Sequence, residues 1–307
     1  VCSSDLTGAN GTVALGRDSL KSLTTGGSNT AVGFQSLDAC TTGSQNTALG
    51  NGALGATDDG VSNTAIGAFA MSLGNVGTTN TAIGCQSMID VTGSHNTAVG
   101  FQSLFDIQSG GSNVAVGSNA IKFANGGESN NVAIGVEAMR DVKENGNTAD
   151  SNIALGSLAM KGGTLGGDFI GNIAIGDRAM DATDTNAQTG TIAIGHHSLT
   201  ALTSGAGNTA VGYTSGADIT TGFNNTLIGF NAGNTGTVDL DGGNSNTYIG
   251  FEARGSSASA INQTVIGKSA HGQGNNSVTL GNTDVTAVYM AQDSGATIYA
   301  SNGVFVD

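Results

Sequence analysis

The sequence predicts an all-β fold, a parallel β-roll (β-solenoid) of about sixteen coils. Three observations predict it. A motif of the form Asn-(Thr/Val/Ile)-Ala-(Val/Ile/Leu)-Gly returns about every 17 residues, 51 of the 307 residues are glycine, and proline and tryptophan are absent. Short periods repeated this often are typical of solenoids, in which each copy forms one coil. The scarcity of bulky side chains suits a thin core built from many similar layers.

The glycine that closes each motif marks the repeat. Most intervals between consecutive closing glycines are 16 to 18 residues, four are 19 to 21, and the last is 14. The closing glycines are Gly16, Gly33, Gly50, Gly67, Gly84, Gly100, Gly117, Gly135, Gly156, Gly176, Gly195, Gly212, Gly229, Gly250, Gly267 and Gly281. The repeat therefore predicts a shaft over 7–281. Residues 1–6 lack the repeat and read as the translation of a sequencing adapter, so we expect them to be non-native.

Each coil is expected to contain two strands. Residues 29–33 (NTAVG) are rich in β-branched side chains and bounded by turn formers, which predicts a short strand. Its apolar positions are consecutive, a pattern typical of a strand covered on both faces. Residues 34–37 (FQSL) follow with one recurring apolar anchor, so we expect a return strand there.

An asparagine stands four residues before the closing glycine in twelve of the sixteen copies. In-register stacking would bring these amides into a hydrogen-bonded ladder between coils. A ligand-binding row of amides is the alternative, and we favour the structural ladder. The asparagines are Asn29, Asn46, Asn63, Asn80, Asn96, Asn113, Asn131, Asn152, Asn172, Asn208, Asn225 and Asn246.

The next position is threonine in nine copies and valine or isoleucine in most others. A threonine row resembles that of ice-binding β-solenoids, but their arrays have two threonine columns, and here there is one. Exchange of threonine with valine and isoleucine predicts a mostly buried position. We therefore do not expect ice binding.

Four intervals carry extra residues at the same phase of the repeat, at 141–151, 161–171, 181–190 and 234–245. Insertions in phase emerge on one side of a solenoid, which is often its binding side. The first three belong to successive coils and should form one lateral patch. The candidate binding residues in these loops are Asp141, Lys143, Glu144, Asp150, Lys161, Asp168, Asp181, Asp184, Asp239 and Asp241.

Charge and composition exclude several classes of partner. The formal net charge of −14, with nine Lys and Arg residues, leaves no basic stripe for a nucleic acid. No apolar run is long enough to insert into a bilayer. The three cysteines, Cys2, Cys40 and Cys85, have no paired spacing and predict neither a disulfide framework nor a zinc site.

Metal and catalytic motifs are weak. His196 and His197 follow a closing glycine, and on a strand they would point to opposite faces, so we interpret them as surface histidines rather than metal ligands. Residues 184–188 and 239–242 alternate oxygen ligands but lack the full calcium-loop pattern, so loop-bound calcium is a minor alternative to having no cofactor. No catalytic grouping can be assembled from the dispersed carboxylates.

The repeat ends at Gly281, and the chain changes character after it. Residues 285–290 and 296–300 are expected to be longer strands joined by a turn. We interpret 282–307 as a short β cap or junction, which would cover the open edge of the last coil.

The repeat resembles two related groups of proteins: the head domains of trimeric autotransporter adhesins, built from SVAIG-type coils in a left-handed β-roll, and bacteriophage tail fibres with longer versions of that coil. Residues 273–281 (QGNNSVTLG) are closest to the adhesin form, and 41–50 (TTGSQNTALG) to the fibre form. The resemblance covers about 7–281. Residues 278–286 are similar to the stretch that leads, in many tail fibres, into a self-cleaving chaperone.

Both groups assemble as three chains around a common axis, so the resemblance implies a homotrimer. The consecutive apolar positions point independently to a partner that covers the second face of each strand. We expect a non-enzymatic, extracellular shaft of a virus tail fibre or similar appendage, which attaches to a glycan or protein receptor on a cell surface. A bacterial surface adhesin or end-to-end filament is the alternative, and a glycan-degrading tailspike is a third.

Overall fold

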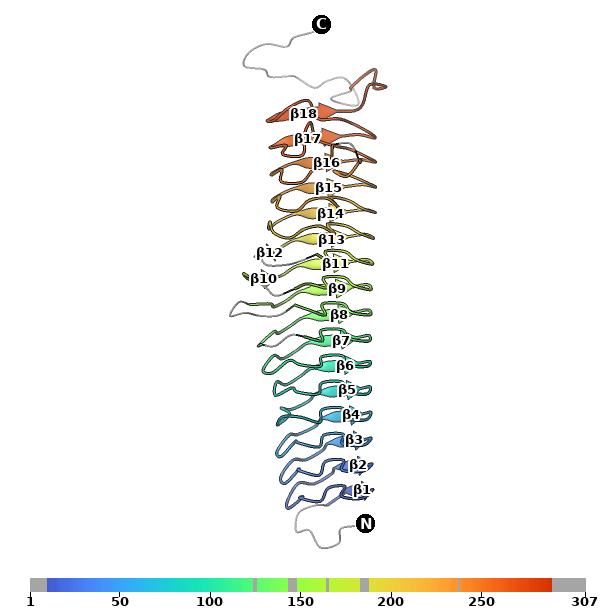
Figure 1. The fold of residues 1–307 in the computed structure, drawn as a ribbon, viewed down its shortest axis with the longest axis vertical. Helices are drawn as coiled ribbons and strands as arrows, with labels where there is room; N and C mark the ends of the chain where they lie inside the picture. The colour runs from blue at the N-terminus through green and yellow to red at the C-terminus, as the bar shows by residue number, and fades with distance from the viewer. Residues whose placement is uncertain are drawn as a thin grey trace, which may run out of the picture.

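The computed structural model is a single stack of coils that rises from the N-terminal to the C-terminal end of the chain (Figure 1). It describes residues 10–123, 126–142, 148–163, 166–182, 188–236 and 238–288. Sixteen strands form one parallel sheet, in which neighbouring strands come from successive coils. The predicted all-β parallel β-solenoid is thus confirmed. The described part of the chain holds no helix of the length and apolarity that a membrane span requires.

The strands of this sheet are three or four residues long. They are β1 (Val13–Leu15), β2 (Thr30–Val32), β3 (Thr47–Leu49), β4 (Thr64–Ile66), β5 (Thr81–Ile83), β6 (Thr97–Val99), β7 (Val114–Val116), β8 (Val132–Ile134), β9 (Ile153–Leu155), β11 (Ile173–Ile175), β13 (Ile192–Ile194), β14 (Thr209–Val211), β15 (Thr226–Ile228), β16 (Thr247–Ile249), β17 (Gln263–Ile266) and β18 (Ser277–Leu280). A second parallel sheet pairs β10 (Phe169–Ile170) with β12 (Gln188–Thr189).

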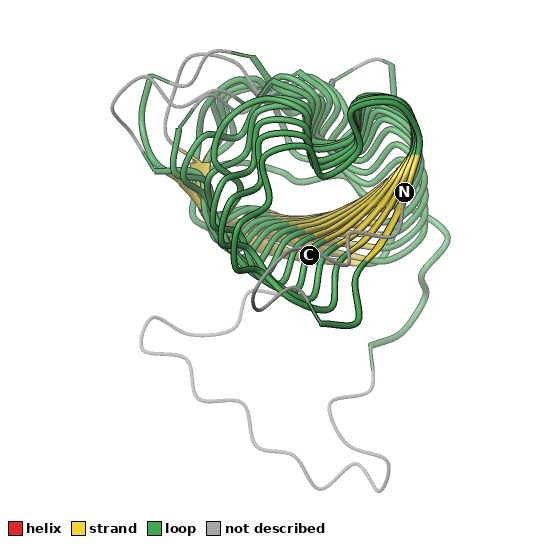
Figure 2. Cartoon of the chain, turned by 90° about the horizontal axis from the view of Figure 1, so that it is seen from below, coloured by secondary structure: helices red, strands yellow, loops and turns green. Residues whose placement is uncertain are grey.

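Equivalent motif residues pair with one another throughout the large sheet. Thr30 pairs with Thr47. Val132 pairs with Ile153 across the first long interval, so the insertion loops out without shifting the register. Seen end-on, the coils superpose, with the strands on one side and turns closing the other (Figure 2). Because the register is constant, each motif position forms a column along the rod.

The core lies between the sheet and the turns that close each coil. The middle residue of nearly every strand is buried and is alanine in most coils. Opposite the sheet, the segment after each strand from β1 to β9, and after β11 and β13, contributes a buried leucine, methionine or isoleucine, such as Leu37 and Met71. Toward the C-terminal end the middle residues enlarge to Leu227, Tyr248 and Val265. One small and one long side chain per layer therefore fill a core of nearly constant width.

The segment after the strand is a turn, so the prediction of a return strand was wrong. Gln35 and Leu37 have φ angles of 54° and 50°, in the left-handed region. Neighbouring coils stabilise this conformation: the Gln35 N–H donates to the Arg17 carbonyl at 3.0 Å and the Leu37 N–H to the Ala53 carbonyl at 3.0 Å. The same alternation of left-handed residues returns in most coils. Hydrogen bonds between layers thus replace those of a strand.

The outer face of the sheet also differs from the expectation. The first and third residues of the three-residue strands point away from the core, and within one chain they are half-buried or exposed. In the third-position column, Leu49 is 47% exposed and Ile83 39%. The threonine column is covered over most of its surface even in the single chain, as the prediction of a mostly buried position requires. The consecutive apolar pattern arises because alanine faces inward while its neighbours face outward.

Two terminal predictions fall largely outside the described residues. Residues 1–6 are among those not described. Of the predicted cap at 282–307, the structure describes 282–288, which contain a turn and no strand, so the strand expected at 285–290 is not formed over 285–288. Residues 289–290 and the strand expected at 296–300 lie outside the described residues.

Candidate functional site

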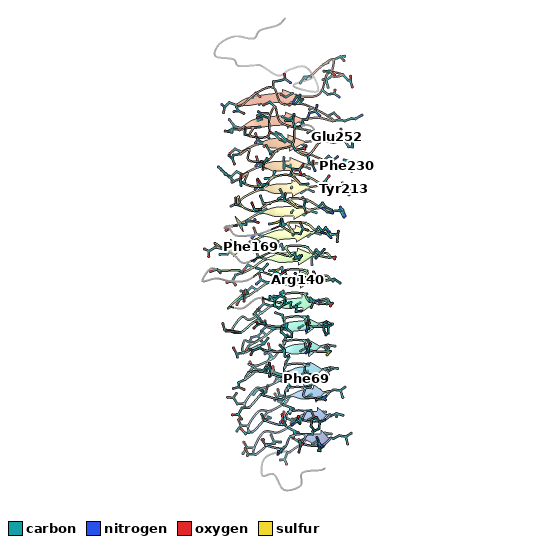
Figure 3. The ribbon with its side chains drawn as sticks, in the orientation of Figure 1. Phe69, Arg140, Phe169, Tyr213, Phe230 and Glu252 are labelled. Carbon is teal, nitrogen blue, oxygen red and sulfur yellow. The ribbon has the colours of Figure 1, made fainter. Side chains whose placement is uncertain are left out.

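The first three long insertions emerge beside the N-terminal ends of the strands, and β10 and β12 directly precede β11 and β13. Two of them contribute β10 and β12, which pair in parallel at the side of the rod. Phe169 in β10 is fully buried and anchors its insertion to the core. Figure 3 shows Phe169 on the side of the rod opposite Tyr213 and Phe230, which follow the C-terminal ends of β14 and β15. The first three insertions therefore occupy one lateral surface, as far as the structure describes them. The fourth does not continue this surface, contrary to the expectation: the Leu240 N–H donates to the Gly233 carbonyl at 2.9 Å, so its extra residues directly follow the turn of its coil instead of preceding the next strand.

Two insertion carboxylates are acceptors for backbone groups of the preceding coil. Asp150 accepts from the Ser129 N–H at 2.7 Å. Asp168 accepts from the Thr148 N–H at 3.0 Å. These contacts give both side chains a structural use, because each hydrogen bond ties one layer to the next.

The other carboxylates of the first three insertions bind cations or hydroxyls nearby. Asp141 pairs with Arg140 at 2.6 Å, and Arg140 also contacts Glu137 at 2.8 Å. Asp181 accepts from the Thr200 hydroxyl at 2.6 Å. Lys161 is half-buried, and its carbonyl accepts from the Asp141 N–H at 2.8 Å. The predicted residues Lys143, Glu144 and Asp184 lie outside the described residues.

The fourth insertion holds the remaining candidate calcium ligands. Asp239 accepts from the Gly236 N–H at 2.7 Å, and Asp241 accepts from the Thr220 hydroxyl. Leu240 between them is buried in the core. The two carboxylates therefore already have protein donors. The calcium alternative stays untested.

The twelve asparagines form one buried column along the rod. In the repeating arrangement, the side-chain oxygen of Asn46 accepts from the Asn63 N–H at 2.9 Å, and its side-chain nitrogen donates to the Gly60 carbonyl at 2.7 Å. Backbone groups are therefore the main partners of the column, rather than only neighbouring amides. Thr191 and Gln263 take the place of asparagine in two coils, and their N–H groups still donate to the preceding asparagine. This geometry leaves the amides no room to contact a ligand.

The outer sheet face consists of two columns of side chains, at the first and third strand positions. Its outer residues are threonine, valine, isoleucine or leucine in β1 to β16, with no charged residue. Across β1 to β18, nine residues of these two columns are among the exposed large hydrophobic residues of the described chain. These are Val13, Leu15, Leu49, Ile83, Ile134, Ile228, Ile266, Val278 and Leu280. We call this surface the outer sheet face.

A row of stacked rings lies just beyond the closing glycines. Tyr213 stacks on Phe230 with ring centroids 5.1 Å apart, and Phe230 stacks on Phe251 at 5.3 Å. His196 extends the row by stacking on Tyr213 at 5.1 Å and an interplanar angle of 3°. All four residues directly follow a closing glycine, so the sequence places them in one column, although no single motif reveals the stack.

His196 and His197 do not point to opposite faces, contrary to the expectation. They lie in a turn rather than a strand, and His197 has a φ angle of 55°. Their ring centroids are 4.2 Å apart, and the His196 Nε2 lies 3.5 Å from a carboxylate oxygen of Asp177 in the preceding coil.

Comparison with models of protein families gives no match, and comparison with the sequences of curated proteins gives none either.

Proposed function

We propose that this protein is the shaft of an extracellular attachment fibre, in which three copies associate through their outer sheet faces. The observation that carries the proposal is the length and uniformity of that face. Sixteen strands of about three residues give a surface roughly 70 Å long and 10 Å wide, or about 700 Å². One of its two columns is aliphatic in every coil, and threonine takes nine of the sixteen positions of the other. The face as a whole is comparable in size to the largest apolar patch of a typical monomer, about 300–600 Å², which is itself often functional.

A second copy of this chain is the occupant that fits the outer sheet face best. The face repeats once per coil, at about 4.8 Å, so a partner must offer apolar groups at the same spacing along the same length. An identical solenoid meets that requirement without adjustment. The net charge of −14 resides on the other surfaces, so close approach through the uncharged face keeps the charges apart. The number three comes from the resemblance to adhesin heads and tail fibres.

Receptor contact is assigned to the lateral surface of the insertions. β10 and β12 lie beside the end of the main sheet rather than over its outer face (Figure 2). Association through the outer face therefore leaves this surface open to a glycan or protein on a cell. Loops carried by a rigid scaffold are the usual place for recognition.

The chain number tests the assembly. Untagged protein should sediment with three times the 30.1 kDa of one chain. Replacing Ile83 and Ile134 on the outer sheet face by glutamate should yield single chains, because the charges would be buried at the interface. Ile261→Glu is the matched control, since Ile261 is similarly exposed but lies outside the strands. A stable wild-type monomer would refute the trimer proposal.

Attachment is tested with intact cells. Fluorescently labelled rods should bind a subset of a bacterial strain panel, and a variant with 161–171 shortened to the usual coil length should bind less. The same rod would also suit a bacterial adhesin or end-to-end filament. Neighbouring genes distinguish these from a virus fibre: genes for tail proteins favour the fibre, and a gene for a membrane anchor favours the bacterial surface.

Release of oligosaccharides from purified surface polysaccharide would instead support a tailspike, which requires a pair of carboxylates around the scissile bond.

A further inference from the structure

Asp177, His196 and His197 form a cluster of potential metal ligands on the side of the rod away from the insertions. One ligand atom from each residue can be chosen such that all three atoms lie within 4.8 Å of one another. No other group of three or more His, Cys, Asp or Glu residues in the described chain meets this criterion. The cluster spans two successive coils, because Asp177 follows Gly176 and the histidines follow Gly195.

The backbone brings the three side chains together. The His197 N–H donates to the Asp177 carbonyl at 3.0 Å, which fixes the two residues side by side in adjacent coils. The left-handed conformation of His197 turns its side chain toward that of His196, and the ring centroids are 4.2 Å apart. The convergence therefore follows from the coil geometry and does not depend on an ion.

The ring of His196 is also oriented in advance. It stacks on Tyr213, which is itself held by Phe230. Stacking uses the faces of the imidazole, whereas a metal binds the nitrogen lone pair at its edge, so the two contacts do not compete. A ring already fixed in orientation loses little further freedom when it binds a ligand.

The donor set selects the class of ion. Two imidazole nitrogens and one carboxylate oxygen suit Zn²⁺ and related divalent transition metals, whereas Ca²⁺ and Mg²⁺ prefer oxygen donors alone. Donor atoms bound to a tetrahedral Zn²⁺ at about 2.0–2.2 Å lie about 3.3 Å apart. The separation of 3.5 Å between His196 Nε2 and Asp177 Oδ2 is already close to this value. The three ligand atoms lie within 4.8 Å of one another, so the His197 nitrogen has to approach the other two more closely to complete the set.

We propose that Asp177, His196 and His197 bind one divalent transition-metal ion per chain, of the Zn²⁺ class, with water at the remaining position. The side chains of His196 and Asp177 are 43% and 42% exposed, so the ion and its water can reach the site directly from solvent. The site lies outside the insertions and does not depend on the proposed attachment function.

Titration of untagged protein with Zn²⁺ by calorimetry, and with Co²⁺ by visible absorption, tests the site. We expect one ion per chain, and the d–d absorption of Co²⁺ should indicate nitrogen ligation. His197→Asn should weaken binding by at least about tenfold, the loss that even supporting residues of metal sites produce. His95→Asn is the matched control. His95 is exposed and has a φ of 63° against 55° for His197, and asparagine tolerates both conformations.

Asp177→Asn is a second test on a surface side chain, with the same expected loss. Circular dichroism of the metal-free variants checks that the fold is retained, and the melting temperature should rise with Zn²⁺ more in the wild type and in His95→Asn than in His197→Asn and Asp177→Asn. Equal affinity of His197→Asn and His95→Asn would overturn the site. The absence of saturable binding at one ion per chain in the wild type would overturn it as well.

Discussion

Replacing Asn46 by alanine should destabilise the rod locally. The Asn46 side chain is fully buried and serves two backbone groups: it accepts from the Asn63 N–H at 2.9 Å and donates to the Gly60 carbonyl at 2.7 Å. Alanine removes both partners and leaves two polar groups in the interior. Each buried polar group without its partner costs about 1–3 kcal/mol, so the expected loss is about 2–5 kcal/mol.

The loss should be confined to the coils around the substitution, because each coil of a solenoid contacts only its neighbours. Hydrogen exchange followed by mass spectrometry should therefore show faster exchange in residues 46–80 than in the distant coils. Urea unfolding at one fixed protein concentration gives the overall change, since association would make stability depend on concentration.

Asn51→Ala is the matched control, because Asn51 is exposed and lies outside the buried column. Surface substitutions of this kind usually change stability by less than about 0.5 kcal/mol. If Asn46→Ala and Asn51→Ala unfold at the same urea concentration and exchange alike, the asparagine column does not stabilise the stack as argued.

Three further predictions each concern a single residue. Gly100→Ala should lower the free energy of unfolding, measured with urea, by at least about 2 kcal/mol. Gly100 has a φ of 135°, and a new Cβ would lie 2.6 Å from the Gly117 carbonyl oxygen. An unchanged urea midpoint would contradict this prediction. Partial burial and the charge of Asp90 raise the pKa of Asp106. Protonation therefore favours the folded state, and stability should rise as pH falls from neutral toward the carboxyl range. Asp106→Asn should stabilise the protein at pH 7 and flatten this dependence in melting curves, and a variant less stable than the wild type would refute the argument. The buried Tyr248 hydroxyl has no hydrogen-bond partner among the described residues. Tyr248→Phe should therefore raise the free energy of unfolding by about 1 kcal/mol. A decrease of that size would contradict the prediction.

Much of the fold could be predicted because the repeat itself encodes the register. A residue that recurs at one phase of a parallel, in-register stack must form a column. The asparagines around Asn46 and the closing glycines around Gly100 could therefore be placed before any coordinates existed. The first three insertions could be placed on one side for the same reason, and β10 and β12 lie there together. The fourth was wrongly placed with them, because its extra residues precede the buried Leu240 rather than the next strand.

The candidate sites were less predictable. Several insertion carboxylates, such as Asp150 and Asp168, proved to be acceptors for the preceding coil, which no local pattern reveals. The repeat places His196 in one column with Asp177 and Tyr213, but the predicted strand after the closing glycine would have pointed His197 to the opposite face. The observed turn, with a φ of 55° at His197, brings the three side chains together instead.

The sequence by itself determined the coil, its period and the columns that run along the rod, because the period sets which residues stack. Only the tertiary structure decided how the chain turns between strands. Gln35, Leu37 and His197 adopt left-handed conformations that their own side chains disfavour, and hydrogen bonds from coils about 17 residues away hold them there. Those turns direct the histidine rings and leave the outer sheet face open, so the candidate metal site and the proposed interface both depend on contacts between layers.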